Sequence, residues 1–183
     1  RQKYSAREIL LVLLWAALHD RPILWACQAW NWPEGRRPGR LPHASTVSRR
    51  RRRSGVDALL NRCHAKLVES LATTEPREGW AVIDGMPLTV SDFSKDPDAR
   101  NGRAYRHWGH GYKLHAVFDS QGVVLRFEVC PLNVNERVAA SRLLPGLERY
   151  VRRVLADGNY DGKPLQQRLE GRPIKLYTPL INN

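Results

Sequence analysis

Cysteine is scarce in this chain, and the few that occur lie far apart. Cys27, Cys63 and Cys130 form no Cys-x-x-Cys pair, so the sequence has neither the ligand spacing of a zinc ribbon nor a disulfide framework. Unpaired thiols are typical of a reducing compartment, and we expect a cytoplasmic protein.

Long hydrophobic runs are also missing. The longest, Ile9–Leu18, has about ten residues, whereas a membrane span needs roughly 20. No small-residue cleavage site follows it, as a signal peptide would require. We therefore expect no membrane association. The hydrophobic content of 42% is nevertheless enough for a folded core.

Acidic residues are rare in the first third of the chain. Up to Lys66 there are 14 Lys and Arg against four Asp and Glu, and beyond it 16 against 14. The first third therefore carries +10 of the net charge of +12. Basic charge concentrated in this way is typical of a protein that binds a polyanion, and double-stranded DNA is the first candidate.

This basic region has the sequence pattern of a helical domain. Ser5, with Glu8 three residues later, forms a capping box before an apolar stretch, which predicts a helix over Ala6–His19. That helix is apolar nearly all round, so we expect it in the core of a small bundle, together with the nearby tryptophans. The further expected elements are a helix from Pro22 to Ala29, a loop over Asn31–Pro42 and a helix over Ser54–Leu71.

A short basic helix is expected between these elements. Ser45 is a candidate N-cap, and Val47 would face inward while a run of arginines faces outward. The arrangement resembles a helix-turn-helix, whose last helix enters the major groove. A basic linker or a nuclear-localisation-like run is the alternative. The candidate DNA-contacting residues here are Ser45, Thr46, Ser48, Arg49, Arg50, Arg51, Arg52 and Arg53.

Beyond a polar linker the pattern changes from helical to alternating α/β. We expect a helical domain over residues 1–72, a linker over 73–79 and an α/β domain over 80–183. Residues Met86–Arg106 are polar and are expected to be irregular. The predicted strands are Trp80–Asp84, Gly111–Phe118, Val123–Val129, Val151–Asp157 and Ile174–Leu180; the predicted helices are Asn135–Tyr150, shortened or kinked by Pro145, and Lys163–Leu169.

Two of these strands end in an acid followed by glycine, at Asp84-Gly85 and Asp157-Gly158. Either acid alone could simply cap a turn. The order of three strands, helix, strand, helix, strand is the layout of ribonuclease H-like nucleases, in which strands one and four are neighbours. The two carboxylates would then meet, and hard oxygen ligands favour Mg²⁺ or Mn²⁺. Such ions can promote in-line displacement at phosphorus.

Four segments, taken together and in order, resemble the DDE transposases of bacterial insertion sequences. They are Val82–Pro87, Gly111–His115, Pro131–Glu136 and Leu155–Asp161. The resemblance runs from about Trp80 onward. It implies that Asp84 and Asp157 are the first two acids of an Asp-Asp-Glu triad and hold catalytic metal, that the enzyme cuts transposon ends and joins them to target DNA, and that two ends are paired by a dimer or larger complex.

The third acid of that triad, a Glu on a later helix, has no match in this chain. Glu170 lies on the wrong helix, and Asp161 and Glu136 are expected to be capping or supporting groups. We therefore expect a C-terminally truncated transposase, inactive alone.

Three points stay open at this stage. A non-catalytic DNA-binding module, decayed or repurposed from a transposase, is the main alternative, and a ribonuclease of the same fold is a third. Lys113 could contact DNA phosphate or be a solvated strand lysine.

Overall fold

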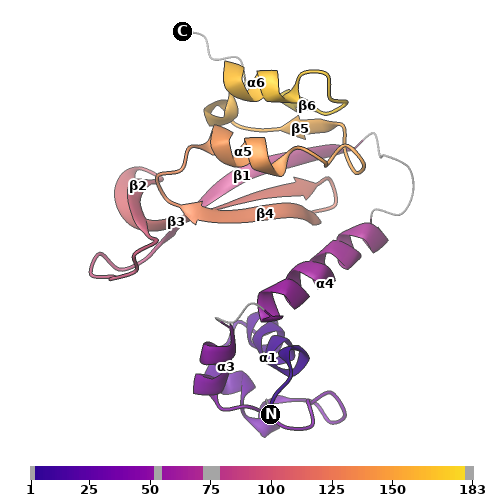
Figure 1. Cartoon of the computed structure of the whole chain (residues 1–183), viewed down its shortest axis with the longest axis vertical. Helices are drawn as coiled ribbons and strands as arrows, with labels where there is room; N and C mark the ends of the chain where they lie inside the picture. Colours follow the sequence, from indigo (N-terminus) through magenta and orange to yellow (C-terminus); the bar gives the residue numbers. More distant parts are fainter. Residues whose placement is uncertain (1–2, 52–54, 72–78, 180–183) are drawn as a thin grey trace. The chain divides into compact units, whose positions relative to one another are not determined.

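The computed structural model describes residues 3–51, 55–71 and 79–179. The chain forms two compact units, Arg1–Ser70 and Leu71–Asn183, and each is described by itself (Figure 1). The expected linker over residues 73–79 lies outside the described residues except for Gly79.

The N-terminal unit is helical. Its elements are α1 (Ala6–Leu18), α2 (Ile23–Ala26), the 3₁₀ turn η1 (Ala29–Asn31), α3 (Ala44–Arg51) and α4 (Gly55–Leu71). The capping box at Ser5 and Glu8 is confirmed, because each side chain bonds the backbone N–H of the other residue. Burial of α1 is one-sided, however: Ile9 and Val12 are fully buried, whereas Leu18 is 74% exposed.

The second helix is shorter than predicted. It ends at Ala26 because side chains that follow it bond its carbonyls: Trp32 Nε1 donates to Ala26 O and Asn31 Nδ2 donates to Trp25 O, both at 2.8 Å. The Trp32 ring stacks on Trp15 with ring centroids 4.8 Å apart. Trp30 is 78% exposed, so the prediction that this tryptophan belongs to the core is wrong.

Helix α3 begins two residues earlier than the sequence suggested. Ser45 was expected as its N-cap, but Ser45 lies inside the helix, which begins at Ala44. His43 takes the capping role instead, because its ring Nδ1 accepts from the backbone N–H of Ser45 at 3.3 Å and its carbonyl accepts from Thr46 and Val47. The inward position of Val47 is confirmed, since that side chain is fully buried.

The C-terminal unit is built on one mixed sheet. Its strand order is β2-β3-β1-β5-β6, and β4 pairs with β3 as well. Strand β3 is antiparallel to β1 and β4, whereas β1, β5 and β6 are mutually parallel. This is the ribonuclease H-like arrangement predicted from the sequence. The first and fourth predicted strands, which are β1 and β5 here, are neighbours in the sheet. The strands are β1 (Trp80–Thr89), β2 (Arg100–Ala104), β3 (His107–Asp119), β4 (Val124–Pro131), β5 (Arg153–Leu155) and β6 (Lys175–Tyr177).

The prediction of an irregular segment over Met86–Arg106 is partly wrong. Strand β1 continues to Thr89, and β2 forms a hairpin with β3. The sequence pattern did not reveal β2, because the buried positions of this strand are Gly102 and Ala104, which carry almost no apolar side chain. A Cβ at Gly102 would lie 2.6 Å from the carbonyl oxygen of Leu132, so close backbone packing, and not hydrophobic alternation, holds this strand.

Helices α5 (Glu136–Leu143) and α6 (Lys163–Leu169) belong to the layer that covers one face of the sheet (Figure 1). Helix α5 contacts β3 and β4, and beneath the helices Ile83, Val117 and Val154 are almost completely buried. As predicted, the helix before Pro145 is short; α6 has the bounds that the sequence indicated. Asp84 lies on the opposite face of β1 from Ile83, because side chains alternate along a strand.

Candidate active site

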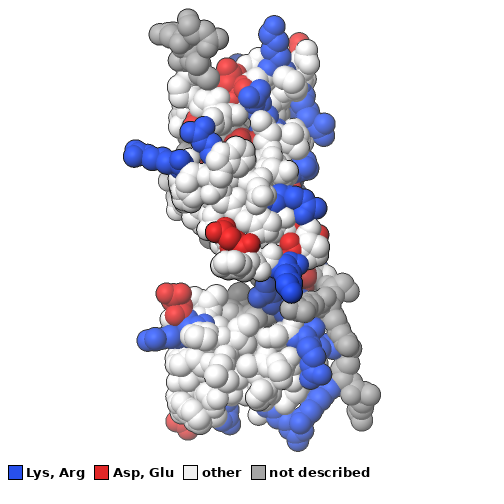
Figure 2. Space-filling view, turned by 90° about the vertical axis from the view of Figure 1, so that its left-hand side faces the viewer, with Lys and Arg blue, Asp and Glu red and all other residues white. Residues whose placement is uncertain are grey.

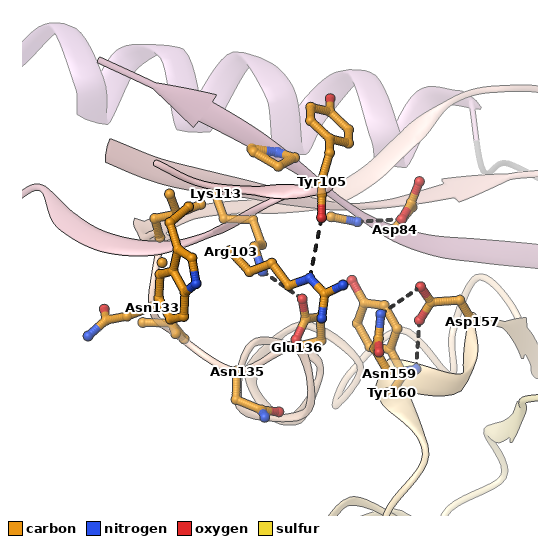
Figure 3. Close-up of a pocket in the computed structure, with 16 residues that line it drawn as sticks. Asp84, Arg103, Tyr105, Lys113, Asn133, Asn135, Glu136, Asp157, Asn159 and Tyr160 are labelled. Carbon is orange, nitrogen blue, oxygen red and sulfur yellow. Dashed lines mark hydrogen bonds and ion pairs between the residues drawn. The ribbon is translucent and has the colours of Figure 1, made fainter. Parts of the chain in front are cut away.

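The two acids predicted from the sequence belong to neighbouring parallel strands: Asp84 lies within β1, and Asp157 comes two residues after the end of β5. In the β1–β5 ladder Val82 is opposite Leu155, and the same register, continued by two residues, brings Asp84 level with Asp157. Neighbouring strands are about 4.8 Å apart. Both acids are exposed and line one pocket of about 540 Å³ (Figure 3).

Each acid is held by uncharged donors. Asp84 Oδ1 accepts the backbone N–H of Gly85 at 2.7 Å. Asp157 caps the 3₁₀ turn η2 (Gly158–Tyr160): its Oδ1 accepts the backbone N–H of Asn159 at 2.9 Å and its Oδ2 accepts the Asn159 side-chain amide at 3.2 Å. Among the described residues neither acid has a Lys or Arg within ion-pair distance. The two carboxylates therefore line the same pocket, and no described Lys or Arg forms an ion pair with either of them.

A third carboxylate in the pocket is neutralised. Glu136, the first residue of α5, lies 2.6 Å from Lys113 Nζ, and the exposed fractions of the two side chains are 24% and 9%. Burial opposes ionisation of Glu136, but the hydrogen bond from Lys113 and the backbone N–H at the helix start outweigh it, so the pKa of Glu136 lies below its ordinary value. The expectation that Glu136 is a supporting group agrees with this pairing.

Beneath the acids lies a buried tyrosine–histidine pair. Tyr160 Oη and His115 Nδ1 are 3.0 Å apart, and both side chains are almost fully buried. Burial raises the pKa of Tyr160, and the charges of Asp84, Glu136 and Asp157 raise it further. Burial lowers the pKa of His115, with Lys113 acting in the same direction. The tyrosine therefore stays protonated and the histidine tends to stay neutral.

The rim of the pocket comes from the β2–β3 hairpin. Arg103 Nε donates to the carbonyl of Tyr105 at 3.3 Å, which holds a turn in which Tyr105 has a φ of 55°. Trp108, 78% exposed, also lines the pocket. In Figure 3 the Arg103 side chain extends towards the acids, whereas the Tyr105 ring points away from them. An arginine and an indole thus border a pocket that contains two unpaired acids.

A family model described as the transposase DDE domain matches residues 76–182, which is more than half of the chain. The chain belongs to this family. No curated protein and no solved structure matched it.

The donor set of this DDE domain suits the divalent metal that the family uses. Mg²⁺ is commonly held by one or two carboxylates, with water and substrate phosphate as the other ligands. Asp84 and Asp157 supply two hard oxygen ligands without a competing cation. The described parts of the chain contain no group of three His, Cys, Asp or Glu side chains placed to hold a metal ion. The chemistry of the two carboxylates, as hard oxygen donors that line one pocket, suits such an ion.

Sequence reasoning missed several residues of the DDE-domain pocket. Tyr160 and Asn159 lie inside the segment Leu155–Asp161 that carried the resemblance, and their proximity to Asp157 was the available signal. Arg103 and Trp108 gave no signal, because the segment around them shows no strand-like alternation. Lys113 is neither solvated nor free, since it is 7% exposed and paired with Glu136.

The predicted DNA-contacting residues lie mostly on α3, in the N-terminal unit. Ser45, Ser48, Arg49 and Arg51 are exposed, whereas Thr46 and Arg50 are half-buried. Arg52 and Arg53 lie outside the described residues. Figure 2 shows Lys and Arg side chains gathered along one edge of this unit, with few acids among them. No described helix is long and apolar enough to cross a membrane.

Proposed function

We propose that this chain is the DNA-binding and catalytic-core portion of an insertion-sequence transposase. It would bind double-stranded DNA through the basic N-terminal unit and direct phosphodiester cleavage and strand transfer to the pocket that contains Asp84 and Asp157. One observation supports the proposal: Asp84 of β1 and Asp157, just beyond the neighbouring parallel strand β5, line one pocket of a transposase DDE domain, and neither is paired with a described Lys or Arg.

The two acids would hold Mg²⁺ or Mn²⁺. A bound divalent ion polarises the phosphate and stabilises the charge on the attacking and leaving oxygens. Asn159 keeps the Asp157 carboxylate in one orientation through two hydrogen bonds, and Gly85 does the same for one oxygen of Asp84. Their pre-orientation reduces the cost of ordering the acids when a ligand binds.

The remaining charged residues of the pocket suit a phosphate backbone. Arg103 offers a guanidinium, which is a good bidentate phosphate donor. Lys113 faces the same pocket, but a direct contact with phosphate would require it to share its ammonium between Glu136 and the DNA. Trp108 offers a flat exposed surface on which a base could stack.

On α3, Ser45, Thr46 and Ser48 would bond the DNA near the helix start, and Arg49–Arg53 would contact phosphates. We further propose a cytoplasmic protein that pairs two DNA ends as a dimer or larger complex.

The resemblance implies three catalytic acids. Glu136 is the only other carboxylate in the described pocket, and it is neutralised by Lys113, so we expect no cleavage by the 183-residue chain alone. A non-catalytic DNA-binding module is the second candidate, and the same neutralised carboxylate favours it.

The coupling between metal and DNA separates the two candidates. If the acids and a metal form one surface with DNA phosphate, Mn²⁺ must raise the affinity for a duplex that ends in the cleavage site, and DNA must raise the affinity for Mn²⁺ by the same factor. We expect a 5- to 150-fold effect, roughly the usual range of such coupling. It should disappear in Asp84→Asn and Asp157→Asn and persist in Asp92→Asn, an exposed acid outside the pocket. DNA binding that ignores Mn²⁺ in the wild type would favour the non-catalytic module.

A further inference from the structure

We propose that Tyr160, held by His115, is a positioning residue that fixes Asp84 and Asp157 relative to each other. The proposal deepens the proposed function, on which it rests for what the two acids hold. The geometry that supports it consists of the contacts that join this tyrosine to both acids.

Tyr160 is joined to Asp157 through the backbone. Asp157 is the N-cap of the η2 turn and Tyr160 is its last residue, and the backbone N–H of Tyr160 donates to the carbonyl of Asp157 at 3.2 Å. Only Gly158 and Asn159 separate the two residues, so a shift of Tyr160 would be transmitted to the backbone of Asp157.

Tyr160 is joined to Asp84 through Gly85. A Cβ placed on Gly85 would lie 2.9 Å from His115 Nδ1 and 3.3 Å from Tyr160 Oη. The backbone of Gly85 therefore rests directly on the hydroxyl–imidazole pair, and its N–H donates to Asp84 Oδ1 at 2.7 Å. Tyr160 and His115 therefore support Gly85, the residue whose N–H orients Asp84.

The hydrogen bond between Tyr160 and His115 holds the two side chains in place beneath Gly85. His115 is fully buried, and its second ring nitrogen, Nε2, has no hydrogen-bond partner among the described residues. The ring is therefore oriented by one hydrogen bond and by packing against the Tyr160 ring, edge-on with centroids 6.2 Å apart. Loss of the hydroxyl would release the imidazole and leave a buried Nδ1 unsatisfied, an arrangement that proteins seldom tolerate without rearrangement.

The test replaces Tyr160 by Phe in the full chain, which removes the hydroxyl alone. Two readouts are compared with the wild type: the amide signals of Gly85 and Asn159 in ¹H–¹⁵N NMR without metal, and Mn²⁺ affinity by titration calorimetry. We expect both amides to shift and the Gly85 amide to exchange faster with solvent. We also expect Mn²⁺ affinity to fall about 10-fold or more, the usual effect of removing a residue that orients a metal ligand.

The matched control is Tyr112→Phe, which also removes a bonded hydroxyl from the same unit, the one that donates to Asp96 at 2.8 Å. It should leave both amides and Mn²⁺ affinity unchanged. A double-mutant cycle with His115→Gln adds a second comparison, and we expect the double variant to resemble the single ones because the two residues act together.

An unchanged Gly85 amide in Tyr160→Phe would overturn the proposal. If the wild type bound no Mn²⁺, the metal assignment in the proposed function would fail by itself, and the two amides would still decide the role of Tyr160.

Discussion

Lys113 Nζ lies 2.6 Å from Glu136 Oε1, which joins the middle of β3 to the first turn of α5 immediately beside the two free acids. The pair is largely shielded from solvent. It neutralises one of the three carboxylates that line the pocket and leaves the other two for a ligand.

Glu136→Gln should destabilise the C-terminal unit by about 2 kcal/mol, because Lys113 keeps its charge in a shielded place and loses its counter-ion. Urea denaturation followed by fluorescence measures this. Glu148→Gln is the matched control: its partner Arg172 has a side chain 44% exposed, so the loss should stay below about 1 kcal/mol. Equal losses in the two variants would show that the Lys113–Glu136 pair is no more than a surface ion pair.

Gly85→Ala should destabilise the same unit by about 1–3 kcal/mol, because the new methyl group would press on His115 and Tyr160. Gly39→Ala, in the N-terminal unit, controls for the effect of an added methyl group alone, since a Cβ there meets no atom within 4 Å. Urea midpoints measure both. A Gly85→Ala variant as stable as the wild type would mean that His115 and Tyr160 can move away from residue 85 without loss of stability.

The stability of the C-terminal unit should fall as pH falls below about 6.5, the ordinary pKa of histidine. Burial and Lys113 lower the pKa of His115 in the folded state, against the opposite pull of Glu136 and Glu128. The unfolded chain then binds a proton that the folded chain resists, so stability is complete above the unfolded pKa and is lost as pH falls towards the folded one.

Thermal unfolding between about pH 7.5 and pH 5, a range that reaches at least one unit to either side of that pKa, measures this slope. His115→Gln should flatten it, whereas His107→Gln, at an exposed position, should not. The same slope in all three proteins would assign the pH dependence to other groups.

Arg49→Ala combined with Arg51→Ala should weaken DNA binding and reduce the slope of log affinity against log salt by about 2, close to one unit for each phosphate that is no longer neutralised. Arg7→Ala with Arg21→Ala removes the same charge from exposed positions elsewhere in the N-terminal unit. Fluorescence anisotropy with a duplex at several salt concentrations measures both pairs. Equal slopes for the two double variants would mean that overall charge, and not α3, binds the DNA.

The parts of the fold that the sequence revealed are those with a hydrophobic signal. Apolar runs that end in Asp84 and Asp157 predicted the two neighbouring strands, and the capping box at Ser5 predicted the start of α1. Strand β2 was missed because glycine and alanine face inward there, and no hydrophobic pattern marks a strand held by close backbone packing.

The sequence brought Asp84 and Asp157 together, and both line one pocket, but it did not reveal the residues around them. Tyr160 and His115 are 45 residues apart in the chain, and only the fold brings them together. Lys113 was assigned to phosphate or to solvent because nothing near it in sequence identifies Glu136 as its partner. At α3, Ser45 matched the usual preference for an N-cap, yet the ring of His43, which is not among the preferred N-cap residues, takes that role.

Mn²⁺ titration calorimetry on the wild type, Asp84→Asn, Asp157→Asn and the double variant tests most directly whether Asp84 and Asp157 form one metal site. We predict binding in the wild type, its loss in each single variant and no further change in the double variant. Binding that survives either single substitution at wild-type affinity would contradict one shared site.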